Sequence, residues 1–175
     1  MKIWQFIELP DYVTLLSGIA AVIAMFQAIE QHFALAASLM LASVICDYLD
    51  GKIARAVNRK NKQFGSVLDT VTDIVSFGVA PVVFAYCVGM TSPLHMIVLL
   101  AFVVAAILRL ARFHAMPYSE TSFTGMPVTY NSVFIPLVYF GLISASLDGY
   151  LTSVLLVVYV VLAMLMLSSI RWIKF

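Results

Sequence analysis

The stretch "CDYLDGKIARAVNRKNKQFGSVLDTVTDIVSFG", residues 46–78, places four aspartates in an otherwise strongly apolar chain. Hydrophobic residues make up 63% of the 175 residues and charged residues only 11%, whereas about a quarter of a soluble domain is charged. The composition therefore predicts an integral membrane protein. A carboxylate inside a membrane is costly and usually functional, so the aspartates are the first candidates for a site. They are Asp47, Asp50, Asp69 and Asp73.

Six apolar segments follow one another along the chain, each close to the length that crosses a bilayer. We expect all six to be helices, because an isolated strand leaves its backbone polar groups unpaired in lipid. The sequence thus predicts an all-α integral membrane protein with six transmembrane helices, forming a single domain over residues 1–175. The segments span approximately residues 12–28, 33–48, 66–88, 94–116, 126–147 and 151–170.

Before the first span, "MKIWQFIELP" (residues 1–10) places Ile3, Trp4 and Ile7 at helical spacing. This pattern favours a short helix lying in the membrane interface. A terminal segment anchored by its aromatic residues is the alternative interpretation.

The ten lysines and arginines all fall on one side of this six-helix arrangement. By the positive-inside rule, that side and both chain termini are expected to be cytoplasmic, with the protein in the cell membrane. The chain has no basic tail, and we expect no nucleic-acid partner. The basic residues are Lys2, Lys52, Arg55, Arg59, Lys60, Lys62, Arg109, Arg112, Arg171 and Lys174.

The aspartates form two pairs that can meet at one site. Asp47 and Asp50 are three residues apart, and Asp69 and Asp73 are four apart, so each pair shares one helical face. The two helices are consecutive and antiparallel, which places both pairs near the cytoplasmic end. Each ionised aspartate in a membrane costs about 2.5 to 3.5 kcal/mol, so a cation must offset them. Oxygen ligands alone favour Mg²⁺ or Mn²⁺, and two such ions suit diphosphate chemistry.

Two alternatives accompany this interpretation. Gly51, Ala54 and Gly65 lie beside the aspartates and leave room for a ligand, although small residues also serve close helix packing in membranes. Intramembrane carboxylates can also line a proton or cation pathway. A cation carrier is the less favoured function, because the acids cluster at one end of two neighbouring helices.

The run "DYLDGKIAR" with "FGSVLDTVTD" resembles the signature of the CDP-alcohol phosphatidyltransferases, D-x2-D-G-x2-A-R-x8-G-x3-D-x3-D. One departure is that nine residues, 56–64, separate the arginine from the second glycine, and an extra residue in a connecting loop is well tolerated. The resemblance implies a six-helix core with a cytoplasmic active site, usually as a homodimer. The matching positions are Asp47, Asp50, Gly51, Ala54, Arg55, Gly65, Asp69 and Asp73.

The resemblance also implies roles for these residues. The four aspartates would hold two divalent cations on the diphosphate of a CDP-lipid, and Asp73 would be the general base as the acceptor hydroxyl displaces CMP. Gly51, Ala54 and Gly65 would line the cytidine pocket. Arg55 would pair with a phosphate or with an aspartate, and its spacing does not decide between them.

Three other stretches bear on the acceptor alcohol. "DIVSFGVAP" (73–81), "LRLARFHAM" (108–116) and "FTGMP" (123–127) look like segments of the membrane-embedded phosphatidylserine synthases in this family. They favour L-serine, with another acceptor such as glycerol 3-phosphate or inositol phosphate as the alternative, and with either diacylglycerol or archaeol as the lipid.

Serine carries a carboxylate that needs a cation. Arg109 and Arg112 are three residues apart, and the forked donors of arginine match a carboxylate; anchoring in lipid headgroups is their other interpretation. Ser76, one turn after Asp73, is a further candidate contact. Asn131 is expected to form an interhelical hydrogen bond, and Pro81 is expected to kink the third span by removing a helix hydrogen bond.

Overall fold

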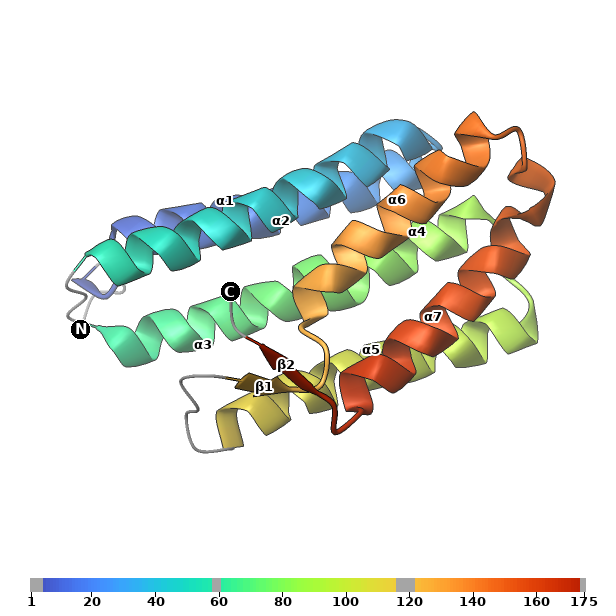
Figure 1. Cartoon of the computed structure of the whole chain (residues 1–175). Coiled ribbons are helices and arrows are strands. Elements are labelled where there is room, and N and C mark those ends of the chain that lie inside the picture. Colours follow the sequence, from blue (N-terminus) through green and yellow to red (C-terminus); the bar gives the residue numbers. More distant parts are fainter. Residues whose placement is uncertain (1–4, 58–60, 116–121, 174–175) are drawn as a thin grey trace.

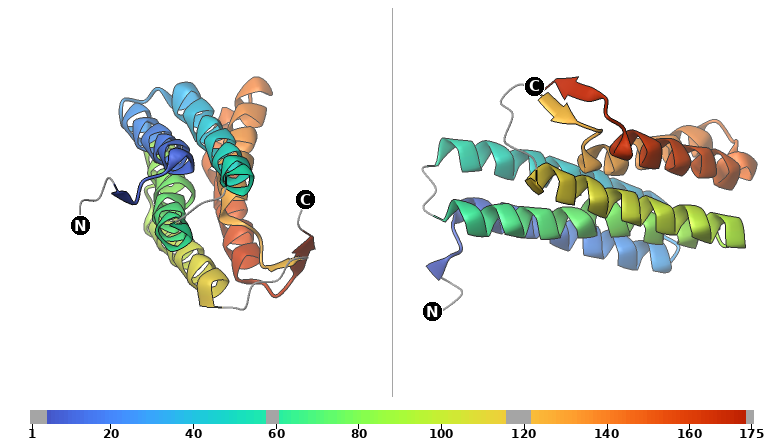
Figure 2. Two further views of the ribbon diagram at one scale, coloured as in Figure 1. Left: turned by 90° about the vertical axis from the view of Figure 1, so that its left-hand side faces the viewer. Right: turned by 90° about the horizontal axis from the view of Figure 1, so that it is seen from below.

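The computed structural model of the protein describes residues 5–57, 61–115 and 122–173. Its main helices run along one long axis and form an elongated bundle (Figures 1 and 2). They are α1 (Leu9–Ile29), α2 (Phe33–Ala56), α3 (Lys62–Asp73), α4 (Ala80–Val88), α5 (Pro93–Ala115), α6 (Asn131–Ser144) and α7 (Leu151–Leu167). A π-helical segment, η2 (Ile74–Val79), joins α3 to α4, and the 3-10 turns η3 (Val128–Tyr130) and η4 (Asp148–Tyr150) precede α6 and α7.

Five helical stretches in the described chain are long and apolar enough to cross a membrane. They match five of the six predicted spans, and they identify an integral membrane protein. The predicted span at 126–147 is instead the shorter apolar helix Val128–Ser144. It starts late because Gly125 has a positive φ of 78° and Pro127 is extended, so neither belongs to the helix. The five long stretches are Leu9–Ile29, Phe33–Ala56, Lys62–Val88, Pro93–Ala115 and Asp148–Leu167.

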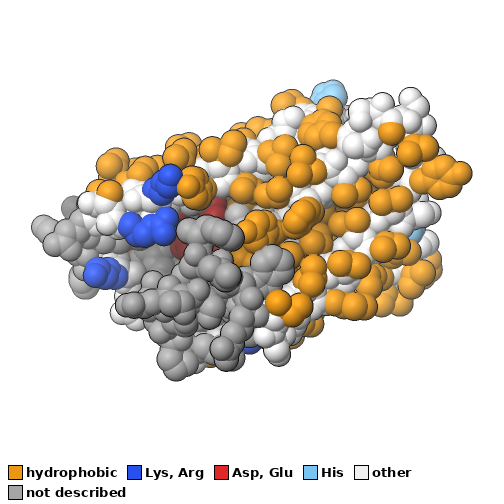
Figure 3. Space-filling model, viewed as in Figure 1, with side chains coloured by type: hydrophobic (Ala, Val, Ile, Leu, Met, Phe, Trp, Pro, Cys, Tyr) orange, Lys and Arg blue, Asp and Glu red, His pale blue; other side chains and the backbone are white. Residues whose placement is uncertain are grey.

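Small side chains allow α1 and α2 to pack closely. Ala24, Ala28 and Ala36 are buried, and the Ser17 hydroxyl lies 2.9 Å from the Ser43 hydroxyl across the interface. Without a hydrophobic force between helices in lipid, such close contacts and polar links stabilise the pair. Large apolar side chains of the two helices, such as Leu16 and Ile45, are exposed instead, and Figure 3 shows hydrophobic side chains spread over the visible surface away from the aspartate end.

Two short strands were not anticipated by the all-α prediction. β1 (Ser122–Thr124) and β2 (Arg171–Ile173) pair in antiparallel register, with Ser122 opposite Ile173. They join the chain before α6 to the chain after α7 (Figure 1). Hydrophobic periodicity cannot detect three-residue strands, because the pattern needs at least four residues to repeat.

The N-terminal end of α1 is capped by its own side chains. Pro10 lies in the first turn, and the Glu8 N–H donates to Asp11 Oδ2 at 2.8 Å as half of a capping box. Such boxes pair donors that a helix start leaves free. The interfacial helix predicted over residues 1–10 falls partly outside the described residues, which begin at Gln5. Both ends of the described chain lie toward the same end of the bundle as the α2–α3 connection (Figure 2).

Candidate active site at the α2–α3 end of the bundle

Three of the four signature aspartates converge. Asp47 on α2 and Asp69 and Asp73 on α3 each offer a carboxylate oxygen, and these oxygens lie within 4.8 Å of one another. Asp47 and Asp73 are close enough to be linked by a hydrogen bond when one of them carries a proton. The three side chains are half-buried. The spacing of the two pairs on antiparallel helices therefore leads to one carboxylate cluster.

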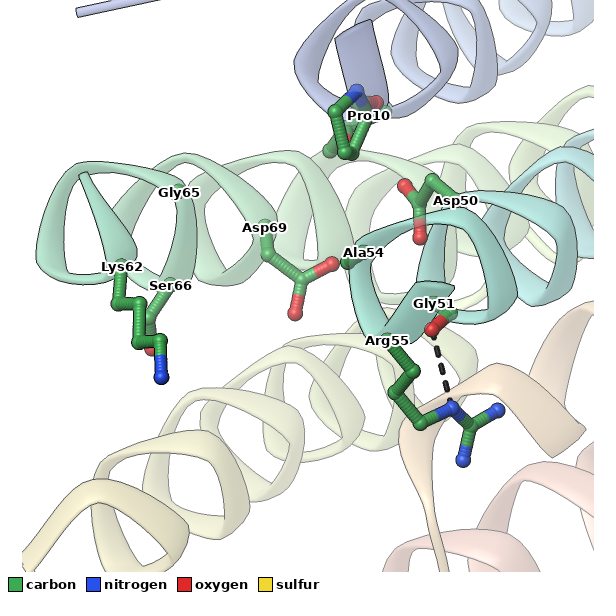
Figure 4. Close-up of a pocket in the computed structure, with 10 residues that line it drawn as sticks. Pro10, Asp50, Gly51, Ala54, Arg55, Lys62, Gly65, Ser66 and Asp69 are labelled. Carbon is green, nitrogen blue, oxygen red and sulfur yellow. Dashed lines mark hydrogen bonds between the residues drawn. The ribbon is translucent and has the colours of Figure 1, made fainter. Parts of the chain in front are cut away.

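The fourth aspartate, Asp50, stands beside this cluster rather than within it. It lines a cavity of about 300 Å³ together with Asp69, and the Asp69 side chain points from α3 toward Ala54 on α2 (Figure 4). Asp50 is only 5% exposed. Its Oδ2 atom has no hydrogen-bond partner in the described part of the chain, so a buried acceptor is left to bind something else.

The small signature residues and Arg55 line the same cavity. A Cβ added to Gly51 would meet no atom within 4 Å, so close packing does not require glycine there. The Arg55 side chain lies along α2, where its Nε donates to the Gly51 carbonyl at 3.1 Å (Figure 4). The cavity wall thus combines small residues (Gly51, Ala54 and Gly65, called the small-residue floor below) with acidic and basic side chains. Its signature residues are Asp50, Gly51, Ala54, Arg55, Gly65 and Asp69.

Four further cavity residues were missed from the sequence. Pro10 and Thr14 come from α1, and Lys62 and Ser66 come from α3. Thr14 is buried and interacts with the Asp50 carboxylate. No spacing rule links α1 to the aspartate helices, but Lys62 and Ser66 could have been found, since each lies three residues from a signature position.

Arg109 is buried beside the carboxylate cluster. It is 6% exposed, and its guanidinium lies 5.4 Å from the centre of the Phe113 ring. It interacts electrostatically with Asp73. Its Nε atom has no hydrogen-bond partner among the described residues. A buried cation with a free donor, next to the candidate base, is well placed to bind an anion.

Arg112 and Ser76 occupy different surroundings. The Arg112 guanidinium donates to the backbone carbonyls of Met166 at 2.8 Å and Ser168 at 3.1 Å, which close the C-terminal end of α7. Ser76 is fully buried in η2, and its hydroxyl has no partner in the described chain. Of the three predicted serine contacts, Arg109 is therefore the one that interacts electrostatically with a cluster aspartate.

Two other polar residues, to which the sequence assigned no role, reach the site. The Thr129 side chain, in η3, lies within reach of the Asp47 carboxylate. His114, near the end of α5, has its Nε2 atom 3.2 Å from Ser66 Oγ and 3.0 Å from Thr70 Oγ1. Both lie far in sequence from the residues they contact, so neither contact could be read from local spacing.

The donor set fits a hard divalent cation. Three carboxylates held within 4.8 Å of one another repel strongly unless a cation lies among them. Carboxylate oxygens suit Mg²⁺ and similar ions. The unpaired Oδ2 of Asp50 adds a buried acceptor next to the cluster. Such a site can clamp phosphate oxygens and stabilise a leaving phosphate.

The chain is similar to known proteins over nearly its whole length, including the aspartate site. An archaetidylserine synthase from Methanothermobacter thermautotrophicus is 31% identical over 174 residues, covering 98% of this chain and 72% of the relative. A CDP-diacylglycerol–serine O-phosphatidyltransferase from Helicobacter pylori is 35% identical over 171 residues, covering 95% of this chain and 72% of the relative. The family model described as CDP-alcohol phosphatidyltransferase matches residues 7–169, which include every aspartate of the cluster. The chain belongs to the CDP-alcohol phosphatidyltransferase family.

Proposed function

We propose that the protein transfers the phosphatidyl or archaetidyl group of a CDP-lipid to the hydroxyl of L-serine and releases CMP. The observation that carries this proposal is the convergence of Asp47, Asp69 and Asp73 beside a cavity lined by Gly51 and Ala54. Relatives named for archaetidylserine and for serine O-phosphatidyl transfer support serine as the acceptor. Because both kinds of relative match, the lipid is either diacylglycerol or archaeol.

The cavity between α2, α3 and α1 is the proposed site of the cytidine diphosphate. Gly51, Ala54 and Gly65 form its small-residue floor, which lets a flat base approach the backbone. Arg55 and Lys62 line the same cavity and carry positive charge toward a phosphate. The cavity adjoins the aspartate cluster through Asp69, so a diphosphate bound here can reach the carboxylates.

Asp47, Asp50, Asp69 and Asp73 would hold two divalent cations, Mg²⁺ or Mn²⁺. When bound, the ions neutralise the diphosphate oxygens and stabilise the departing phosphate. Without a positive charge between them, these carboxylates would repel an anionic substrate as well as one another.

The proposed reaction is a single displacement at phosphorus. The serine oxygen forms a bond to the lipid-bearing phosphorus, the bond from that phosphorus to the CMP oxygen breaks, and the serine proton passes to Asp73. Proximity supplies much of the rate, so a weak carboxylate base suffices. Arg109 interacts electrostatically with Asp73 and would bind the serine carboxylate. Arg112 and Ser76 stay proposed contacts of lower rank, because Arg112 binds the end of α7 and Ser76 is fully buried.

The proposed arrangement in the membrane follows from charge. With Val128–Ser144 counted as a sixth span, the sequence positions of all ten lysines and arginines would assign them to one side. By the positive-inside rule this is the cytoplasmic face of the cell membrane, toward which the active site and both termini would point. Basic side chains gather at the aspartate end of the surface in Figure 3. A homodimer is proposed from the family resemblance.

The test is an acceptor assay with the purified protein. CDP-diacylglycerol and CDP-archaeol are each offered in detergent micelles with Mn²⁺ or Mg²⁺, and with serine, glycerol 3-phosphate or inositol phosphate as the acceptor. CMP release with serine alone is the expected result. Release with another acceptor but not with serine would refute the substrate assignment, and release with none would refute the transferase reaction.

A further inference from the structure

The segment Val128–Ser132, made of η3 and the first two residues of α6, touches both helices that carry the aspartates. On one side, the Thr129 side chain lies within reach of the Asp47 carboxylate of α2. On the other side, Asn131 and Ser132 donate to backbone carbonyls of η2, the segment that begins directly after Asp73. Five consecutive residues therefore link Asp47 to the helix of Asp73.

The hydrogen bonds from α6 to η2 go to the two carbonyls that the missing N–H of Pro81 can affect. Proline has no N–H, so it leaves one carbonyl without its helical partner: that of Phe77 in α-helical spacing, or that of Ser76 in π-helical spacing. Asn131 Nδ2 donates to the Phe77 carbonyl at 3.0 Å, and Ser132 Oγ donates to the Ser76 carbonyl at 3.0 Å. Both of these carbonyls thus accept a hydrogen bond from adjacent side chains of α6.

These substitute bonds stabilise an unusual backbone. In η2 the Ala80 N–H bonds to the Val75 carbonyl five residues back, as in a π-helix. A π-turn inserts an extra residue into a helix and is often found at functional sites. Asn131, Ser132, Ser76 and Phe77 are buried, so water cannot replace the side-chain donors. The widened turn next to Asp73 therefore depends on α6.

We propose that Thr129, Asn131 and Ser132 are positioning residues that hold Asp73 in register with Asp47. This inference rests on the proposed function, in which both carboxylates bind the metal ions. In this proposal, residues at the start of α6 support the metal ligands without binding the metal themselves. In the described residues, α6 contributes no carboxylate to the cluster. Outer partners of metal ligands orient them and raise the affinity for the metal.

The test measures metal binding directly, by electron paramagnetic resonance of Mn²⁺ with the purified protein and CMP. Ser132→Ala and Thr129→Val are each expected to weaken Mn²⁺ binding by about 10-fold, the lower end of the usual effect of losing an outer partner. Ser132→Thr keeps a hydroxyl and is expected to restore binding. The matched control is Ser144→Ala, because Ser144 lies at the other end of α6 and bonds only to Gly141 of its own helix.

A merely structural role for these residues predicts a different result. Ser132→Ala would then lower the thermal unfolding temperature while the folded fraction bound Mn²⁺ with unchanged affinity, and that outcome would overturn the proposal. If Ser132→Ala does not fold, Thr129→Val decides, since Thr129 lies in η3 and makes no bond to η2. Unchanged Mn²⁺ affinity in Thr129→Val would then refute the proposal.

A separate measurement tests the proposed function independently of the positioning role. Asp73→Asn, measured alongside, must lose CMP release if Asp73 acts as proposed. Full turnover in Asp73→Asn would contradict the proposed function, whereas lost turnover there with unchanged Mn²⁺ binding in Ser132→Ala and Thr129→Val would contradict only the positioning role.

Discussion

Glu8 Oε1 accepts a hydrogen bond from the backbone N–H of Asn61 at 2.8 Å, although 53 residues separate them. The Phe6 and Phe64 rings lie beside this contact, with centroids 5.7 Å apart. Asn61 directly precedes α3, which carries Gly65 to the cavity. The chain before α1 thus holds the first turn of the helix that forms one cavity wall.

Glu8→Ala should weaken both the fold and nucleotide binding. It removes the acceptor for Asn61 and also the acceptor in the α1 capping box. A cap or a hydrogen bond to a charged group is worth about 1 to 2 kcal/mol, so the free energy of unfolding should fall by about that amount, and the KM for CDP-lipid should rise several-fold. Glu8→Gln keeps a carbonyl acceptor and is the matched control. Equal unfolding temperatures and KM values for Glu8→Ala and the unaltered protein would refute the proposed support.

Gly125→Ala should be strongly destabilising. Gly125 has a φ of 78°, and a Cβ there would lie 2.5 Å from the Met166 carbonyl oxygen and would overlap the Arg112 guanidinium. Strain in this backbone region costs about 1 to 3 kcal/mol before any clash is added. Gly141→Ala is the control, because its Cβ meets nothing within 4 Å and alanine favours a helix. Thermal unfolding in detergent should separate the two, and similar unfolding temperatures would show that the α6 approach is not tightly packed.

Substitutions of Arg109 and Arg112 should have different effects on kinetics and stability. Arg109→Gln should raise the KM for serine more than the KM for CDP-lipid, because the buried Arg109 guanidinium interacts electrostatically with Asp73. Arg112→Gln should mainly lower the unfolding temperature, because Arg112 binds carbonyls at the end of α7. Steady-state kinetics with each substrate varied in turn provides the measurement. A serine-specific effect in Arg112→Gln with none in Arg109→Gln would reverse the assignment.

The aspartate cluster was predictable because helical spacing is local. Residues three or four apart share a face, and two consecutive antiparallel helices must place Asp47 near Asp69 and Asp73. The prediction that Asn131 makes an interhelical hydrogen bond is also confirmed, by its contact with the Phe77 carbonyl. Spacing could not separate Asp50 from the cluster, because that depends on how α2 is rotated against α3.

The contacts from outside residues 46–78 were not predictable. Thr14 and Thr129 reach the site, and Glu8 reaches Asn61 just before α3, through the packing of whole helices, and no periodicity records such distant pairs. Pro81 was expected to kink the helix by removing a hydrogen bond; the structure has a π-helical segment directly before α4, and side chains of α6 donate to two of its carbonyls. A local rule identifies the missing N–H but not the partner that replaces it.

Asp73→Asn should abolish most turnover without unfolding the protein. Asparagine has nearly the same shape as aspartate but cannot accept the serine proton at the same site, and loss of a general base lowers the rate by about 100- to 10,000-fold. CMP release measures the effect, and size-exclusion chromatography with thermal unfolding checks the fold. Asp148→Asn, which alters an exposed acid outside the cluster in η4, should leave CMP release unchanged. Full activity of Asp73→Asn would remove Asp73 from the role of base.

Gly51→Ala distinguishes a ligand-binding glycine from a packing glycine. If Gly51 served helix packing, alanine would clash and the unfolding temperature would fall. A Cβ at Gly51 meets nothing within 4 Å, and alanine gains about 1 kcal/mol over glycine within a helix, so the unfolding temperature should stay the same or rise. The KM for CDP-lipid should nevertheless increase by about five-fold, as about 1 kcal/mol of overpacking against the bound nucleotide would produce. Gly141→Ala, also in open space but in α6, should gain the same stability with no change in KM. A Gly51→Ala variant with unchanged KM would mean that the nucleotide does not approach the backbone of α2 at this residue.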